Sequence, residues 1–418
     1  MRQKIKISTI IYGFFLLLYY RPASYIIGNA LDNLCLAAIC AMSAYFFIKA
    51  ILKYRVNKYH PTGTTIGLIA FFGWCMIGST AVNYFISGNI SLVNAVTTFL
   101  CEVGIIIVSD MELARNPKRY LKLFICIGGS FSLLNALTMF VYGNRGGLNP
   151  VIERDGRSLS SNYFYLGEDN ATFFLVWPVL VLTWIYYFRY QRTKQMLLWS
   201  VFFTAMILAS YLYMWSVTNI IGCILTIGLI LVYWRRSVKK KQPKPSRFPI
   251  SKFNLGWGAA IIANYLVVIM QIFLRYSDFI VNVLQKSITL GGRTRIWERS
   301  LLAIMQQPLI GFGYETRSVT LTKIIFNHTH NIMLEILYRG GLIGMILFII
   351  VLLSLGRKVK HYQSNGIVMI LAWCIVLFIF LSVFEFAFYR YPYIVLFVLL
   401  GRCNVLVATR KRQEVCVK

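Results

Sequence analysis

Arginine and histidine side chains are concentrated in one stretch of the chain, between two long apolar segments. Arg293, Arg295 and Arg299 precede His328 and His330 in this stretch. A guanidinium group is a rigid fork of donors that matches the oxygens of phosphate and carboxylate. A neutral imidazole can accept a proton from a hydroxyl group. Together these residue types predict a site that binds an anionic group and moves a proton.

The segments that must position these residues are those of a membrane protein. Of the 418 residues, 58% are hydrophobic and 14% are charged, which excludes a soluble globular domain. A helix of about 20 apolar residues crosses the hydrocarbon core of a bilayer. We therefore expect an all-α polytopic membrane protein of about twelve transmembrane helices, with a large extracytoplasmic loop that carries short amphipathic helices. The expected spans are 7–27, 31–52, 63–86, 90–109, 120–142, 166–188, 195–213, 217–234, 254–274, 330–354, 366–382 and 390–408.

The distribution of positive charge orients the expected bundle. The chain has 43 lysines and arginines against 14 acidic residues, a net charge of +29. If both termini are cytoplasmic, the most basic loops, including 235–253, lie on the inner side, as in other polytopic proteins. The loops 143–165 and 275–329 then lie outside, and residues 1–418 form a single integral membrane domain. Because topology and the lipid bilayer account for the charge, no nucleic-acid partner is expected.

The outer loop 275–329 and the start of the following helix are cationic, against this tendency. Only four acidic residues lie among the cations. The surplus predicts an anionic ligand, either the pyrophosphate of a lipid carrier or the headgroups of anionic lipids. The cations are Arg275, Lys286, Arg293, Arg295, Arg299, Arg317, Lys323 and Arg339.

The outer loop also has a helical pattern. Trp297, Leu301 and Ile304 recur at helical spacing, which predicts an amphipathic helix on the membrane surface. The following Gln-Pro-Leu-Ile-Gly-Phe-Gly sequence should break that helix and turn the chain. Asn327 or Thr329 should cap the next helix, placing His330 in or near its first turn. A helix N-terminus favours anions. The alternative is that both histidines are only interfacial polar residues.

The other outer loop offers aromatic, acidic and amide side chains together. The sequence from Asn162 to Phe174 contains Asp169 and Asn170, and Arg157 precedes it. Aromatic faces and amides suit sugar rings, so this segment is a candidate for substrate binding. The same aromatic residues are also typical of the belt at a membrane interface.

No cofactor or metal is expected. His328 and His330 could chelate a metal in an extended segment, but the spacing supplies no third ligand. Most of the nine cysteines lie in apolar spans without a CxxC spacing, as small buried residues do.

Four short motifs in this order resemble the signature of the O-antigen ligase/Wzy-type polymerase superfamily. They are Gly292-Arg293-Thr294-Arg295-Ile296-Trp297, Pro308-Leu309-Ile310-Gly311-Phe312-Gly313, His330-Asn331 and Gly341-Leu342-Ile343-Gly344. The family pattern is GRxxxW, PLxGxG, HN and GxxG in a large extracytoplasmic loop. In addition, Tyr165-Leu166-Gly167-Glu168-Asp169-Asn170 resembles the LGxxN stretch of capsule and exopolysaccharide polymerases of Gram-positive bacteria.

The resemblance implies a reaction and a location. Members of this superfamily transfer a glycan from undecaprenyl pyrophosphate to an acceptor hydroxyl at the bacterial inner or plasma membrane. The transfer proceeds with inversion and without metal or nucleotide sugar. By motif, Arg293 would hold the leaving pyrophosphate and His330 would act as base or position the acceptor. A chain-length regulator or a flippase of the same pathway would be a possible partner.

Further candidate site residues are chosen by their position next to the motifs, and at one position the chain departs from the family pattern. Arg295, Arg299, His328 and Asn331 are further candidates for substrate binding because they flank the motif residues. Family members often carry an arginine at the outer start of a middle span, where this chain has Val217. Arg157 or another loop cation would have to supply that charge.

Three alternatives to a polymerase remain open from the sequence. A ligase shares these motifs but transfers the glycan to a separate acceptor. A flippase for lipid-linked oligosaccharides also suits about twelve spans, yet it should show internal repeats and charges that line a cavity. An inert membrane anchor would leave the arginines and histidines without a role.

Overall fold

The computed structural model describes most of the chain. The described residues are 7–145, 147–148, 152–154, 157–159, 163–238, 251–271, 292–384 and 391–407. The expected basic loop 235–253 and the first part of the outer loop 275–329 thus lie largely outside the described residues, as do Arg275 and Lys286.

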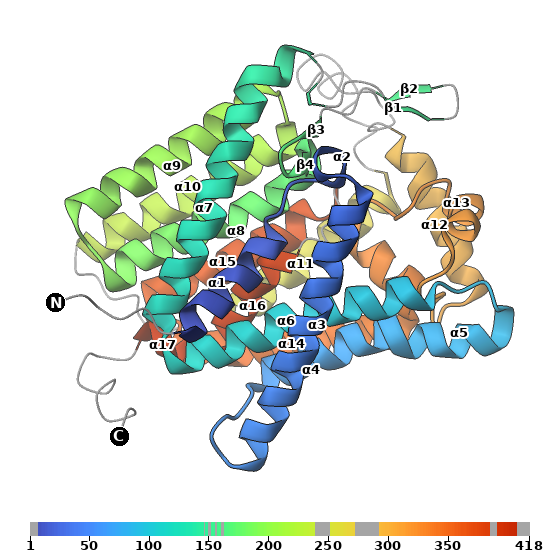
Figure 1. Cartoon of the computed structure of the whole chain (residues 1–418), viewed down its shortest axis with the longest axis horizontal. Coiled ribbons are helices and arrows are strands. Elements are labelled where there is room, and N and C mark those ends of the chain that lie inside the picture. The colour runs from blue at the N-terminus through green and yellow to red at the C-terminus, as the bar shows by residue number, and fades with distance from the viewer. Residues whose placement is uncertain are drawn as a thin grey trace.

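Helices dominate the described structure, as the apolar segments predict (Figure 1). Strands are confined, within the described ranges, to two short hairpins between α7 and α8: β1 (Ile152–Arg154) with β2 (Arg157–Leu159), and β3 (Tyr163–Phe164) with β4 (Gly167–Glu168). The α-helices are α1 (Ile7–Tyr19), α2 (Ser24–Ile27), α3 (Asn29–Arg55), α4 (Gly63–Phe72), α5 (Ser79–Ser87), α6 (Leu92–Arg115), α7 (Pro117–Tyr142), α8 (Asp169–Tyr190), α9 (Lys194–Tyr213), α10 (Val217–Val238), α11 (Lys252–Val268), α12 (Arg293–Gln306), α13 (Arg317–Ile324), α14 (Ile332–Tyr362), α15 (Gly366–Leu381), α16 (Ile394–Gly401) and α17 (Asn404–Val407).

The helices confirm an all-α polytopic membrane protein. Among the described residues, eight helical segments are long and apolar enough to cross a bilayer. Helices α1 and α15 are apolar but shorter. Each expected span overlaps helical structure, but the span 7–27 is interrupted between Tyr19 and Ser24 and the span 390–408 between Gly401 and Asn404, so the number of crossings stays a prediction. The eight are Asn29–Arg55, Gly63–Ile86, Leu92–Arg115, Pro117–Arg145, Thr172–Tyr190, Lys194–Tyr213, Val217–Arg235 and Ile332–Tyr362.

The bundle is built around α6, α8, α15 and α16. Helix α6 packs on α3, α7 packs on α8 and α9, and α14 packs on α4 and α11. Every residue of α16 is buried, so this short apolar helix lies in the centre of the bundle. The described ends of the chain lie at one side of the molecule, whereas α12 and α13 lie side by side at the opposite side (Figure 1).

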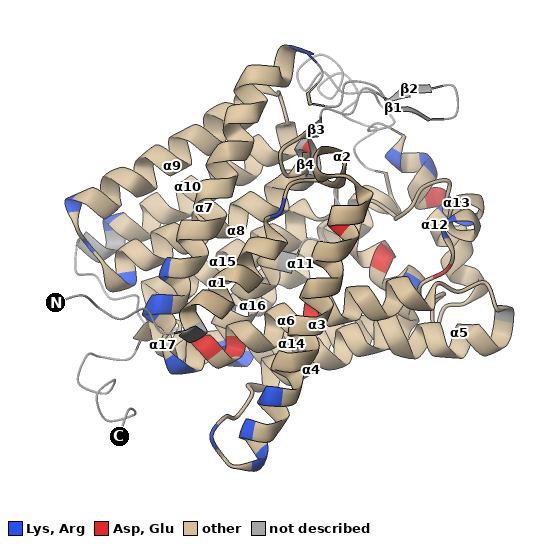
Figure 2. Ribbon diagram, viewed as in Figure 1, with Lys and Arg blue, Asp and Glu red and all other residues tan. Residues whose placement is uncertain are grey.

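Charged residues follow the same division (Figure 2). Lysines and arginines gather near the described ends of the chain and at the connection between α3 and α4, and a second group lies on α12 and α13. The helices between these groups carry few charges, as the hydrocarbon core of a membrane requires. At the side of the termini, Arg402 pairs with Asp110 and donates to the carbonyl of His60 at 2.6 Å.

Helix α14 is kinked at Gly341, where φ is 59° and ψ is −160°. A kink leaves backbone groups without their helical partners, and these groups need others. The carbonyls of Tyr338 and Arg339 accept from the amides of Phe312 and Gly313, at 2.7 and 2.9 Å. The carbonyl of Gly340 accepts from the indole of Trp74 at 2.8 Å.

On the other side of the kink, two backbone amides of α14 find hydrogen-bond partners in the segment that ends with Phe312 and Gly313. The amides of Leu342 and Ile343 donate to the carbonyls of Pro308 and Leu309, at 2.8 and 3.2 Å. The Pro308–Gly313 motif and the Gly341–Gly344 motif are therefore two halves of one backbone contact. We call the segment Pro308–Gly313 the docking loop.

Glycine is required where the two backbones meet. Gly311 and Gly313 have φ of 73° and 62°, a region that glycine adopts readily. A Cβ on Gly311 would stand 2.6 Å from the carbonyl carbon of Arg339, and one on Gly313 would stand 2.6 Å from the backbone of Thr80. A Cβ on Gly341 would meet the carbonyl of Leu309. The motif glycines are thus explained by close backbone approach.

Replacement of Gly341 by alanine should destabilise the protein. The positive φ alone costs about 1–3 kcal/mol for a residue with a Cβ, and the contact with Leu309 adds to it. We expect Gly341→Ala to lower the midpoint of thermal unfolding in detergent by several degrees.

Gly228→Ala in α10 is the matched control. A Cβ there meets no atom within 4 Å, and alanine favours a helix over glycine by about 1 kcal/mol. Its midpoint should equal or exceed that of the wild type. Equal midpoints for Gly341→Ala and the wild type would show that the docking of the loop does not need this glycine.

Candidate functional site

Helix α12 confirms the predicted amphipathic helix. It follows Gly292, whose φ of 84° turns the chain, and Arg293 is its first residue. Trp297 is fully buried, and Ile304 is buried on the same face. This face packs on α13 and α14, so these residues are buried inside the protein, and the position of the helix on the membrane surface stays a prediction.

The cations of the outer loop fall into two groups. Arg293 is half-buried, and Arg295, Arg299 and Arg317 are exposed. Lys323 and Arg339, by contrast, bind carboxylates of the protein itself. The prediction that all of these cations serve a ligand was therefore wrong for these two, because their charges are already neutralised inside the fold.

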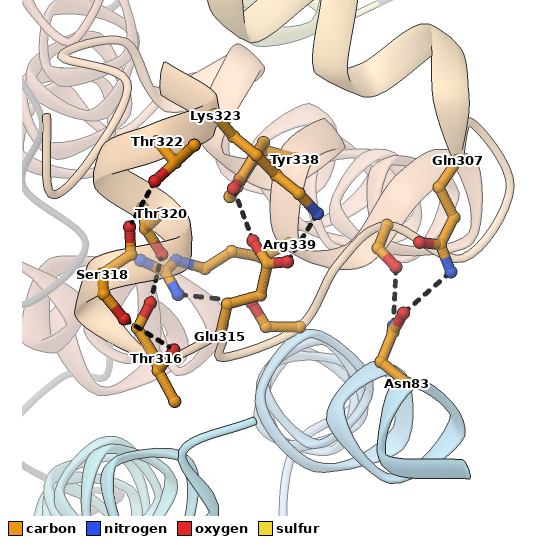
Figure 3. Close-up of polar contacts among 12 residues, drawn as sticks. Asn83, Gln307, Glu315, Thr316, Ser318, Thr320, Thr322, Lys323, Tyr338 and Arg339 are labelled. Atoms are coloured by element: carbon orange, nitrogen blue, oxygen red, sulfur yellow. Dashed lines mark hydrogen bonds and ion pairs between the residues drawn. The ribbon is translucent and has the colours of Figure 1, made fainter. Parts of the chain in front are cut away.

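Glu315 anchors α13 to α14 (Figure 3). Its carboxylate accepts from the hydroxyl of Tyr338 at 2.6 Å and pairs with the ammonium group of Lys323 at 2.6 Å. That ammonium group also lies 3.5 Å from the centroid of the Phe312 ring. The neighbouring contacts in the figure hold the docking loop to α5: the amide of Asn83 donates to the carbonyl of Gly311 at 2.8 Å and accepts from Gln307 at 2.9 Å.

His328 and His330 lie in a turn that precedes α14, and we call the residues 326–331 the histidine turn. The ring centroids of the two histidines are 4.1 Å apart, and that of Phe326 is 4.6 Å from His330. His330 has φ of 52°, and its amide donates to the Nδ1 atom of His328 at 3.3 Å. Both histidines are half-buried, so their imidazole rings are partly accessible to solvent.

Asn331 caps α14, so the prediction of Asn327 or Thr329 as the cap was wrong. Its side-chain oxygen accepts from the amides of Met333 and Leu334, both at 3.0 Å. Its nitrogen donates to the carbonyl of Val383 at 3.0 Å. His330 therefore precedes the helix rather than lying in its first turn, because the asparagine with a partner in a distant segment takes the capping position.

The structure attaches Arg293 and the histidine turn to the same helix. Helix α12 packs on α14, and the turn leads into α14 through Asn331. A small apolar cluster joins these elements, including Trp297, Ile324 and Leu334. The four motifs thus lie on or against the first part of α14, between its start and the residues that follow the kink.

The residues of the second loop are placed less fully. Arg157 lies in β2, and Asp169 and Asn170 are the first two residues of α8; the structure describes the backbone but not the side chains at these positions. Val217 begins α10, next to the buried Ser216. Substrate binding by Arg157, Asp169 and Asn170 stays a prediction. In the described ranges there is no cluster of three or more metal-binding side chains.

Sequence reasoning missed the role of Glu335. Its carboxylate is fully buried and lies between the backbone of the histidine turn and the guanidinium of Arg339. The spacing of four between Glu335 and Arg339 was a signal, because it places both side chains on one face of a helix.

The described structure defines the class: a polytopic helical membrane protein in which a helix that begins with Arg293 and a turn that contains two histidines both adjoin α14. Comparison with known proteins then confirms the resemblance to the O-antigen ligase/Wzy-type superfamily. The family described as O-Antigen ligase matches residues 216–349, which contain all four motifs.

Two curated relatives agree with this family. An O-antigen ligase of Pseudomonas aeruginosa is 31% identical over 86 residues, which cover 20% of this chain and 21% of the relative. The exopolysaccharide production protein ExoQ of Rhizobium meliloti is 27% identical over 152 residues, which cover 33% of each chain. The alignments thus span a third or less of the length of these relatives.

Removal of the Asn331 side chain should loosen the start of α14. Asn331→Ala deletes a buried cap and the bond to Val383, a loss of about 1–3 kcal/mol. We expect hydrogen exchange, followed by mass spectrometry, to become faster at the amides of Met333 and Leu334.

Asn365→Ala is the control, because Asn365 caps α15 in the same way. Its side-chain oxygen accepts from Ile367 and Val368 at 3.0 and 3.1 Å. This variant should speed exchange at α15 and leave α14 unchanged. Unchanged exchange at Met333 in Asn331→Ala would refute the capping role.

Proposed function

We propose that this chain is a glycosyltransferase of the bacterial inner or plasma membrane, with both termini cytoplasmic. It would polymerise oligosaccharide repeat units carried on undecaprenyl pyrophosphate into a surface polysaccharide, with inversion and without a metal or other cofactor. The observation that supports the proposal is that α12, which begins with Arg293, packs on α14, which begins directly after the turn of His330, and that both lie inside the matched segment.

The proposed reaction exchanges one bond at the anomeric carbon of the donor. The acceptor hydroxyl oxygen forms a bond to this carbon while the bond to the pyrophosphate oxygen breaks. The pyrophosphate leaves with the electron pair, and the guanidinium of Arg293 stabilises the charge that develops on it. The imidazole of His330 receives the hydroxyl proton or orients the acceptor.

The surrounding residues have supporting roles in the proposal. Arg295 and Arg299 are exposed on α12, where their charge can hold the pyrophosphate of the donor. His328 and Asn331 fix the turn that carries His330, through the bonds described above. Arg157, Asp169 and Asn170 would contact the glycan from the second loop.

Ligase-type transfer to a separate acceptor is the second candidate. It is favoured by the name of one relative, O-antigen ligase, whereas the other is named as an exopolysaccharide production protein. Both reactions would use the same donor and the same site. We prefer the polymerase because the residues from Tyr165 to Asn170 resemble a stretch found in polymerases. A chain-length regulator or a flippase of the same pathway would be its partner.

Purified protein in nanodiscs, supplied with undecaprenyl-pyrophosphate-linked repeat units alone, should produce a ladder spaced by one repeat on a gel. Arg293→Ala should lower the rate by about 10²–10³-fold, since it removes a charge that stabilises the leaving group. His330→Ala should lower it by about 10²–10⁴-fold.

Lys118→Ala is the control, because Lys118 is an exposed cation on α7, outside the loop 275–329, and this variant should still produce the ladder. Product only after addition of a separate acceptor would identify a ligase. Absence of transfer with every acceptor, with the lipid-linked unit instead moved across vesicles, would replace the enzyme by a transporter.

A further inference from the structure

The histidine turn is held in a conformation that needs support. His330 has a positive φ of 52°, which costs a residue with a side chain about 1 kcal/mol or more. The hydroxyl of Thr329 donates to the carbonyl of Asn331 at 2.8 Å, and the amide of Ile332 donates to the carbonyl of Ser382 at 3.0 Å. These contacts hold the end of the turn that leads into α14.

The middle of the turn is held by a buried carboxylate. The amide of Thr329, between the two histidines, donates to the Oε2 atom of Glu335 at 2.8 Å. Thr329 and Glu335 are both fully buried, so this bond is shielded from water. A charged acceptor in a dry environment makes a stronger hydrogen bond than a neutral one.

Glu335 is itself fixed from the other side. Its Oε1 atom pairs with the Nε atom of Arg339, one turn further along α14. The guanidinium of Arg339 lies 4.1 Å from the centroid of the Tyr314 ring and donates to the carbonyl of Gly313 at 3.4 Å. The end of the docking loop is thus connected through Arg339 and Glu335 to the backbone beside His330.

We propose that Glu335 is the positioning residue of the histidine turn, and that it sets the orientation of His330 toward the acceptor. Arg339 keeps the carboxylate in place and does not contact the substrate. This inference rests on the proposed function for its catalytic consequence, but the positioning itself is a property of the fold.

Glu335→Gln tests the proposal with almost no change in shape. Both partners of Glu335 are donors, and the amide of glutamine has only one acceptor oxygen. The variant must therefore lose either the bond to Thr329 or the bond to Arg339. We expect kcat for glycan transfer to fall roughly 10- to 100-fold, with KM for the lipid-linked donor within about twofold, because only the histidine turn is displaced.

Glu315→Gln is the matched control. Glu315 is also a buried carboxylate with two donor partners, Tyr338 and Lys323. Neither of these hydrogen bonds involves the histidine turn. Its thermal midpoint should fall about as much as that of Glu335→Gln, while its kcat per folded molecule stays near the wild type. Equal kcat in the two variants would reduce Glu335 to a structural residue and overturn the proposal.

A second readout does not depend on catalysis. The rate at which diethyl pyrocarbonate modifies His328 and His330, measured by peptide mass spectrometry, reports their exposure and orientation. We expect a change of at least about threefold in Glu335→Gln and none in Glu315→Gln. Wild-type reactivity in Glu335→Gln would overturn the positioning role. If the wild-type protein transfers no glycan, the proposed function is wrong. The rates of histidine modification would still show whether Glu335 positions the histidine turn.

Discussion

The kink of α14 at Gly341 is the constraint on which the site depends. It exposes carbonyls and amides on both sides of one residue, and the docking loop satisfies them with four backbone bonds. Backbone bonds of this kind demand close approach, so the loop and the helix are both built from glycines there. Trp74, from the π-helical segment Gly73–Gly78, adds a fifth bond and ties the kink to the helix that runs beside it.

Buried charge then fixes the segments that the backbone contact alone does not hold. Glu315 holds α13 through Lys323 and Tyr338, and Glu335 holds the histidine turn together with Arg339. A buried ion pair is weak evidence for net stability, but removal of one partner leaves a charge uncompensated, so such groups specify one arrangement. The exposed arginines of α12 lie outside this network and remain accessible to an anion.

Much of the fold was predictable because membrane helices are encoded locally. Each expected span overlaps helical structure, since about 20 apolar residues suffice to predict a membrane helix. The pattern of Trp297 and Ile304 likewise predicted α12. The cap of α14 was not predictable in this way, because Asn327, Thr329 and Asn331 are all suitable caps by type. In the structure Asn331 is the cap, and it also donates to the carbonyl of Val383, which lies more than fifty residues further along the chain.

By itself, the sequence determined the class of the protein, the order of its helices and the four motifs that resemble those of the family. These follow from hydrophobic length, charge distribution and residue type, which need no knowledge of distant contacts. Only the tertiary structure showed which cations form ion pairs inside the protein. In the sequence Arg339 and Lys323 resemble the other cations, but in the structure they pair with Glu335 and Glu315. The tertiary structure also decided which groups support the backbone beside His330. The hydrogen bonds of Thr329 and Ile332 join groups that come together only when the chain packs around the kinked helix.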